Sequence, residues 1–414
     1  MYQYFKDMAD GIEAKILQDP DLPNPRKKYA LEVARLGNRL YSGKNRVAWC
    51  GIAVPFDLLN AMGVTSCFVE FVGAVLAATG LADPFLEEAE KAGFVGDTCG
   101  YHRSVIGAAS KNIMPEPDFL IATTCPCSGG IAVMENLAHL FNKDLFVLNV
   151  PQESSEASVA YLADQIKDMV EFVARHTGEP LDERQLRQAV ENTNRTRNIM
   201  EAVYQLAQNI PSPTDGRLLT NFGLVMPLFF GTEAAVEIAR AYQDEFRMRI
   251  DNGIQGVPDE KLRLLWIQNR IQFNNPLVEL LEKQYRTNIV ADELNDIYWD
   301  PIDPHDPYSG MARRAIAIPL NGSVQGRIRH LHKLARAYRL DGAINPCHWG
   351  CRQGSGARGL ISDGLKEISV PVLNLEVDCV DKRNFAESQL RTRIEAFIEM
   401  LASRPRPWQS LEVV

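Results

Sequence analysis

Two apolar runs, one in each half of the chain, lead directly into pairs of cysteines. The run DFLIATT is followed by Cys125 and Cys127, and the run DGAIN by Cys347 and Cys351. A glycine-rich turn and a helical pattern follow each pair. Ligands of open α/β sheets bind outside the carboxyl ends of the strands, and the N–H groups of a helix start favour an anion. We therefore expect each pair to present thiolates at the edge of a sheet.

Two further cysteines can reach the same edge in the first half. Cys99 lies in the segment DTCGYHR, and Cys67 follows a turn at Gly63. In a cytoplasmic protein, clustered cysteines indicate metal binding or redox chemistry rather than disulfides. We predict an iron–sulfur cluster whose candidate ligands are Cys67, Cys99, Cys125, Cys127, Cys347 and Cys351.

The number of candidate ligands suggests a stoichiometry. A cubane cluster has four irons, each normally with one external ligand, so two cubanes need about eight ligands. Six thiolates and one sulfide shared between the cubanes fill these positions, which gives an [8Fe-9S] double cubane. Alternatively, three or four of the cysteines hold one [4Fe-4S] cluster. Cys50, inside an apolar run, and Cys379, after the last expected strand, are interpreted as buried structural thiols.

Two competing cofactors fit the spacing less well. Structural zinc favours Cys-x2-Cys knuckles, whereas this chain has Cys-x-Cys and Cys-x3-Cys. The segment GSGARG at 354–359, with Asp378 downstream, matches a dinucleotide-binding pattern, but residues 346–353 separate it from the strand that should precede it directly. The sequence contains no G-x-x-x-x-G-K-[ST] loop, so we expect any nucleotide hydrolysis to occur in another protein.

Four other side chains lie beside the candidate ligands. His348 and His102 are positioned either to relay protons or to pack over the cluster. Glu70, in an otherwise apolar segment, and Arg103, after Cys99, are possible partners of the ligands. These four are the candidates for a catalytic role, and the sequence alone assigns that role to none of them.

Alternating strand and helix patterns predict the α/β class, with parallel sheets covered by helices. Two long helical patterns, at 154–177 and 181–209, separate the two halves. We predict an N-terminal helical segment (1–43), a first α/β domain (44–176), a helical connector (177–215) and a second α/β domain (216–414). The cluster should lie in the cleft between the domains.

Bulk properties narrow the partners and the compartment. The net charge of −9 and the interspersed charges argue against a nucleic-acid partner. The best apolar windows, 71–82 and 222–231, fall short of the roughly 20 residues of a membrane span. The first 15 residues lack the apolar run of a signal peptide, so we expect a cytoplasmic protein.

The chain resembles the large components of 2-hydroxyacyl-CoA dehydratases and benzoyl-CoA reductases over most of its length. The matching stretches are 53–63, 97–103, the cysteine after DFLIATT, 342–351 and 370–378. The resemblance implies two flavodoxin-like (Rossmann-like) domains with the cluster between them. In that family three cysteines hold one cubane, and the matching positions are Cys99, Cys125 and Cys351.

The additional Cys67, Cys127 and Cys347 resemble those of double-cubane cluster proteins, a branch of the same superfamily. That likeness implies a homodimer that receives electrons from a separate ATP-hydrolysing reductase with its own [4Fe-4S] cluster. The expected function is ATP-dependent, low-potential reduction of small molecules, because saturated irons leave no position for a thioester oxygen. The alternatives are a [4Fe-4S] subunit of a dehydratase or benzoyl-CoA reductase that binds acyl-CoA, and a non-enzymatic electron or cluster carrier.

Overall fold

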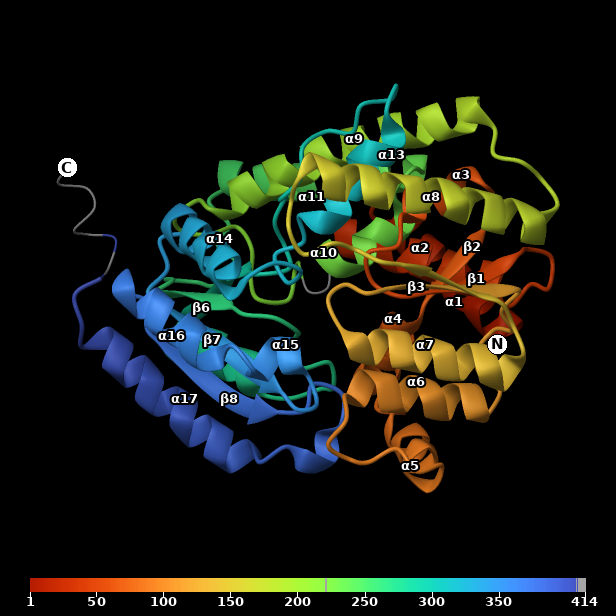
Figure 1. Cartoon of the computed structure of the whole chain (residues 1–414). Helices are drawn as coiled ribbons and strands as arrows, with labels where there is room; N and C mark the ends of the chain where they lie inside the picture. The colour runs from red at the N-terminus through yellow and green to blue at the C-terminus, as the bar shows by residue number, and fades with distance from the viewer. Residues whose placement is uncertain (220–221, 407, 409–414) are drawn as a thin grey trace.

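Two parallel four-stranded sheets form the framework of the computed structural model, which describes residues 1–219, 222–406 and 408. They lie beside one another (Figure 1). The first has the order β2-β1-β3-β4 and the second the order β6-β5-β7-β8. The two orders are equivalent, which confirms the α/β class and the two flavodoxin-like domains. The strands are β1 (Val47–Cys50), β2 (Thr65–Phe68), β3 (Phe119–Thr123), β4 (Leu145–Leu148), β5 (Leu262–Trp266), β6 (Thr287–Asp292), β7 (Gly342–His348) and β8 (Val372–Val377).

Helices cover both faces of the sheets, because the central strands are buried along their whole length. In the first half α7 packs on β3, α8 on β4 and α2 on β2, and in the second half α16 and α17 pack on β8. These helices are α2 (Pro25–Leu40), α7 (Ser128–Phe141), α8 (Glu156–Thr177), α16 (Arg358–Glu367) and α17 (Glu387–Ala402).

A layer of helices runs along one side of both sheets, at the top of Figure 1. It contains the two long helices expected from the sequence, α8 and α9 (Glu183–Ala207). Two helices from the second half, which the sequence patterns did not indicate, pack against them: α11 (Glu233–Asp251) on α9, and α13 (Pro307–Ile316) on α8. The expected connector is therefore part of a larger helical layer.

Two strands differ from the sequence expectation, and each carries a candidate ligand. Strand β2 was not foreseen, and it places Cys67 within the first sheet, opposite Trp49 of β1. Strand β7 was expected to end at Asn345, but its pairing with β8 continues to His348. Cys347 consequently lies within a strand, paired in register with Glu376, and not in the loop beyond it.

The remaining helices are short or lie at the periphery. The expected N-terminal helices are confirmed: α1 (Tyr2–Gln18) packs on α2. None of the helices in the described ranges has both the length and the apolar character that crossing a bilayer requires. The other helices are α3 (Phe56–Ala61), α4 (Val69–Ala78), α5 (Asp83–Lys91), α6 (Gly100–Ser110), α10 (Phe222–Val225), α12 (Leu277–Glu279), α14 (Val324–Ala337) and α15 (Arg352–Ser355).

Candidate functional site

A cavity of about 100 Å³ lies where the carboxyl edges of the two sheets meet. Its walls come from the segments that follow β1, β3, β5 and β7. In each half, these are the two central strands, between which the direction of the chain connections reverses. Such switch points are where open α/β sheets bind ligands, and here two of them share one space. We call it the cysteine cavity.

Four of the six candidate ligands line this cavity: Cys99, Cys125, Cys127 and Cys351. Three of them stand at the start of a helix, Cys99 before α6, Cys127 before α7 and Cys351 before α15. The backbone N–H of Gly354 donates to Sγ of Cys351 at 3.3 Å. Backbone N–H groups at a helix start stabilise negative charge on a nearby sulfur.

Burial dominates the acidity of Cys99, Cys125 and Cys351. It raises the pKa of Cys125 to about 12 and raises the pKa of Cys99 and Cys351 above the usual value. Neighbouring thiols add to the effect, Cys127 for Cys125 and Cys351 for Cys99. A positively charged metal centre is what converts such a set to thiolates.

The structure does not bring Cys67 and Cys347 to the cavity wall. Burial raises the pKa of Cys67, within β2, to about 12. Sγ of Cys347 lies 3.5 Å from Oδ1 of Asn374. Each nevertheless precedes a residue of the site: Phe68 lines the cavity, and His348 contacts Cys99.

The donor set fits an iron–sulfur cluster better than a single ion. Within the described residues, no three His, Cys, Asp or Glu side chains are close enough together to hold one metal ion. A cluster does not need such a cage, because each thiolate binds a different iron. Four thiols and largely apolar walls suit soft metal–sulfur chemistry. The described wall carries a single carboxylate, that of Glu70, whereas hard cations take several oxygen ligands.

His348 contacts one of these thiols from the second half. Its Nδ1 accepts the backbone N–H of Cys379 at 2.9 Å, so the proton of the neutral ring lies on Nε2. Nε2 is 3.2 Å from Sγ of Cys99, to which it donates. Burial lowers the pKa of His348, which favours this neutral form. His348 is thus a hydrogen-bond donor to a candidate ligand.

Glu70 and His102 face each other on the cavity wall. Oε1 of Glu70 is 3.9 Å from Nε2 of His102. Oε2 of Glu70 is buried and has no hydrogen-bond partner among the residues that the structure describes. The pair therefore offers an acidic and a basic group beside the thiols.

Arg103 does not line the cysteine cavity but joins the two halves next to it. It is buried and donates to Glu90 Oε1 (2.7 Å), Thr98 O (3.0 Å) and Asp381 Oδ2 (3.1 Å). Its Nη2 also lies 3.5 Å from Asp378 Oδ2. This candidate therefore holds the domains together.

Four side-chain amides of the cavity wall escaped the sequence reasoning: Gln268, Asn269, Gln272 and Gln353. Nε2 of Gln268 donates to Gly354 O at 2.6 Å, Nε2 of Gln272 donates to the hydroxyl of Tyr101 at 3.0 Å, and Nε2 of Gln353 donates to Pro126 O. No spacing in the sequence marks them, because their partners are far along the chain.

Gly350 also shapes the wall. It has a φ of +70°, and a Cβ there would lie 2.3 Å from the backbone nitrogen of Cys99. Only glycine permits this approach. A glycine between two candidate ligands, Cys347 and Cys351, was visible in the sequence and could have indicated this close approach of the backbone.

Comparison with known proteins places this site in a family. The family model described as 2-hydroxyglutaryl-CoA dehydratase, D-component, matches residues 51–401, which include all four cavity thiols. The chain is 24% identical to the (R)-phenyllactyl-CoA dehydratase alpha subunit of Clostridium sporogenes, over 87% of this chain and 90% of that protein. It is 23% identical to the lactoyl-CoA dehydratase subunit alpha of Anaerotignum propionicum, over 86% and 90% respectively.

A reductase component is similar to the same extent. The chain is 24% identical to a benzoyl-CoA reductase subunit from Thauera aromatica, over 76% of this chain and 79% of that protein. Dehydratase and reductase subunits alike thus match most of the two-sheet framework around the cysteine cavity. The chain therefore belongs to the 2-hydroxyglutaryl-CoA dehydratase D-component family and is an enzyme component of the 2-hydroxyacyl-CoA dehydratase and benzoyl-CoA reductase superfamily.

Proposed function

We propose that this chain carries a double-cubane [8Fe-9S] cluster and uses it for ATP-dependent, low-potential reduction of small molecules. The observation that carries the proposal is the presence of Cys127 in the cysteine cavity. It stands beside Cys99, Cys125 and Cys351, the three positions that match the cubane ligands of the family. The site thus has more thiols than a three-cysteine cubane uses.

The proposed ligands are the four cavity thiols together with Cys67 and Cys347. The last two must turn toward the cavity from β2 and β7, where each is one residue away from a residue of the site. Both cysteines are the second-last residues of their strands, so the proposal requires a rearrangement at these strand ends.

The chain supplies the surroundings of the cluster. Ile52, Phe71, Met134, Leu224 and Leu320 line the cavity and exclude water from it. His348 donates a hydrogen bond to Cys99, while Glu70 and His102 can hold and pass a proton at the cavity wall. When bound, the cluster would supply electrons at low potential.

The proposed partner is an ATP-hydrolysing reductase with its own [4Fe-4S] cluster, which is what the resemblance to double-cubane cluster proteins implies. We further propose a cytoplasmic homodimer. The alpha-subunit names of the relatives support an assembly of more than one chain.

Metal analysis of anaerobically purified protein tests the proposal. About eight irons per chain, with acid-labile sulfide in slight excess, are expected for the double cubane. About four irons would overturn it. Electron paramagnetic resonance of the reduced protein adds an independent count of the coupled centres.

A second candidate is a single-cubane subunit that acts on acyl-CoA esters. It is favoured by the positions of Cys67 and Cys347 outside the cavity, and the relatives are named for CoA-ester substrates. It predicts about four irons, tight binding of a CoA ester, and an unchanged iron content in Cys127→Ala and Cys347→Ala.

A further inference from the structure

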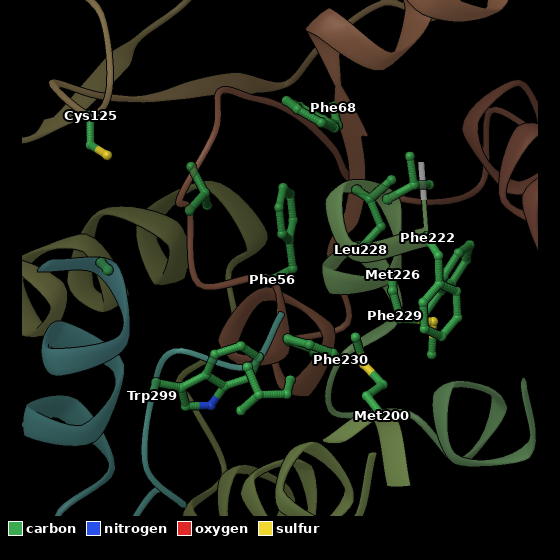
Figure 2. Close-up of a cluster of buried hydrophobic side chains, with 14 of the residues drawn as sticks. Phe56, Phe68, Cys125, Met200, Phe222, Met226, Leu228, Phe229, Phe230 and Trp299 are labelled. Atoms are coloured by element: carbon green, nitrogen blue, oxygen red, sulfur yellow. The ribbon is translucent and has the colours of Figure 1, made fainter. Parts of the chain in front are cut away.

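A second cavity of about 120 Å³ lies beside the cysteine cavity. We call it the aromatic chamber, because five aromatic side chains line it: Phe56, Phe68, Phe230, Tyr298 and Trp299. Figure 2 shows Phe56 between Phe68 on one side and Phe230 and Trp299 on the other, with Cys125 in the same view. The rings pack closely, with centroids 6.2 Å apart for Phe56 and Phe68 and 5.9 Å apart for Phe230 and Trp299.

The two cavities share a wall. Six residues line both of them: Ile52, Phe68, Pro126, Leu224, Asn269 and Leu320. Pro126 lies between Cys125 and Cys127, so the shared wall adjoins two of the thiols. A molecule bound in the chamber would therefore lie next to the proposed cluster.

The charged side chains of the chamber are neutralised by partners. Arg314, Glu293 and Asp296 line it, and each forms an ion pair. The pairs, with their shortest N···O distances, are Arg314–Asp57 (2.8 Å), Glu293–Arg327 (2.6 Å) and Asp296–Lys333 (3.0 Å). An additional charge would enter without a counter-charge, at a high desolvation cost. The chamber therefore selects against phosphates and carboxylates.

Besides the buried Nε1 of Trp299, which has no hydrogen-bond partner among the described residues, two polar groups of the chamber remain for a ligand. The side-chain amide of Asn269 and the hydroxyl of Tyr298 line the chamber and have no hydrogen-bond partner among the described residues. Burial raises the pKa of Tyr298, which keeps its hydroxyl protonated and able to donate. Together they can bind one polar end of an otherwise apolar molecule.

The backbone of the chamber is also unusual at one position. Ala53, three residues after the end of β1, has a φ of +64°, a region that residues other than glycine rarely adopt. Strained backbone of this kind clusters at functional sites. The strain lies at the switch point of the first sheet, where ligands are expected.

We propose that the aromatic chamber binds the substrate: a small, uncharged molecule with one polar end, held by Asn269 and Tyr298. This rests on the proposed function and specifies where its small-molecule substrate binds. An apolar cavity of about 150 Å³ holds benzene or xenon. The chamber is of this size class, and a CoA ester exceeds it.

Xenon tests the chamber without depending on the cluster. Crystals of the full chain under xenon pressure should show xenon in the chamber, with or without iron. Ala315 lines the chamber from α13, and Ala315→Phe should remove the xenon site. Ala317→Phe is the matched control, since this alanine at the end of the same helix is exposed. Absence of xenon in the wild-type chamber would overturn the proposal, as would its retention in folded Ala315→Phe.

Butyronitrile tests the polar end. It carries no charge and has one hydrogen-bond acceptor, so it should bind in the chamber in calorimetry and in soaked crystals. Asn269→Ala should weaken its binding about tenfold, by loss of a hydrogen bond, and should leave the xenon site in place. Equal affinity in this variant would overturn the assigned role of Asn269.

The two proposals fail separately. About four irons with xenon in the chamber would refute the double cubane and leave the binding site. About eight irons with no xenon would do the reverse.

Discussion

The two sheet edges that enclose the cysteine cavity have the same strand order but supply different chemistry. The first half provides three thiols, those of Cys99, Cys125 and Cys127. The second half provides one, that of Cys351, together with the imidazole of His348 and the amides of Gln268, Asn269 and Gln353. The division between the two edges is thus unequal: the first supplies three of the four sulfur donors, and the second supplies the fourth together with an imidazole, which donates to Cys99, and side-chain amides.

The most drastic way to break this division is to remove a thiol from either edge. Cys125→Ala and Cys351→Ala should each abolish the proposed cluster, since each removes a proposed ligand. Iron content and the visible absorption of anaerobically purified protein measure the loss. Cys50→Ala, in β1 and away from the cavity, should keep full iron. Full iron in either ligand variant would show that its half does not hold the cluster.

Breaking the link between the edges should have the next largest effect. Arg103→Met leaves Asp378 buried without its guanidinium partner, while Asp381 keeps its ion pair with Arg383. The free energy of unfolding should therefore fall by about 3 kcal/mol, at the lower end for a broken buried ion pair. Urea denaturation of the iron-free protein measures it. Arg46→Met, at an exposed pair with Asp118, should cost less than about 1 kcal/mol. Equal losses would mean that the buried link is no stronger than a surface pair.

Two of the additional cysteines sharpen the comparison, because Cys127 lies in the first half of the chain and Cys347 in the second. If the double cubane is correct, Cys127→Ala and Cys347→Ala should both lower the iron content from about eight toward four per chain. Cys379→Ala, which changes a core thiol outside the cavity wall, is the control. If only Cys127→Ala lowers the iron content, Cys347 is not a ligand, and the additional ligands come from the first half alone.

The smallest expected effect concerns the hydrogen-bonding role of the second edge. His348→Leu removes the donor to Cys99 and should make the midpoint potential of the cluster more negative, because hydrogen bonds to sulfur stabilise the reduced state. His348→Gln, which retains an N–H donor, should restore most of the potential. Potentiometric titration followed by electron paramagnetic resonance gives both values. Identical potentials in the two variants would exclude this role.

The sequence predicted those parts of the site whose structure depends on residues close together in the chain. Cys125 and Cys127 stand at the end of a strand and the start of a helix, as the apolar run and the glycines indicated. Cys347 was expected beyond the end of its strand, and Cys67 was expected after a glycine turn with no strand foreseen there, but both lie within strands. A four-residue strand such as β2 has too few residues to show an alternating pattern. The last residues of β7 are in a strand because they pair with β8, a contact with a distant segment that the local sequence does not reveal.

The groups around the thiols were harder to foresee, because tertiary contacts create them. The tautomer of His348 depends on the backbone of Cys379, and Gln268 acquires its role from Gly354 and Asn345. Likewise, α11 and α13 join α8 and α9 in one layer only after the whole chain has folded. Periodicity identifies elements, whereas these contacts depend on how distant elements pack.

The separation of Cys99 and Cys351 along the chain has a consequence for biosynthesis. A growing polypeptide that has emerged as far as α9 already contains β1 to β4 and three of the four cavity thiols. The opposite wall, with Cys351, His348 and the amides, has not yet been synthesised. A cluster that takes ligands from both walls could therefore be completed only after translation has passed β7, so its assembly would come late in the synthesis of the chain.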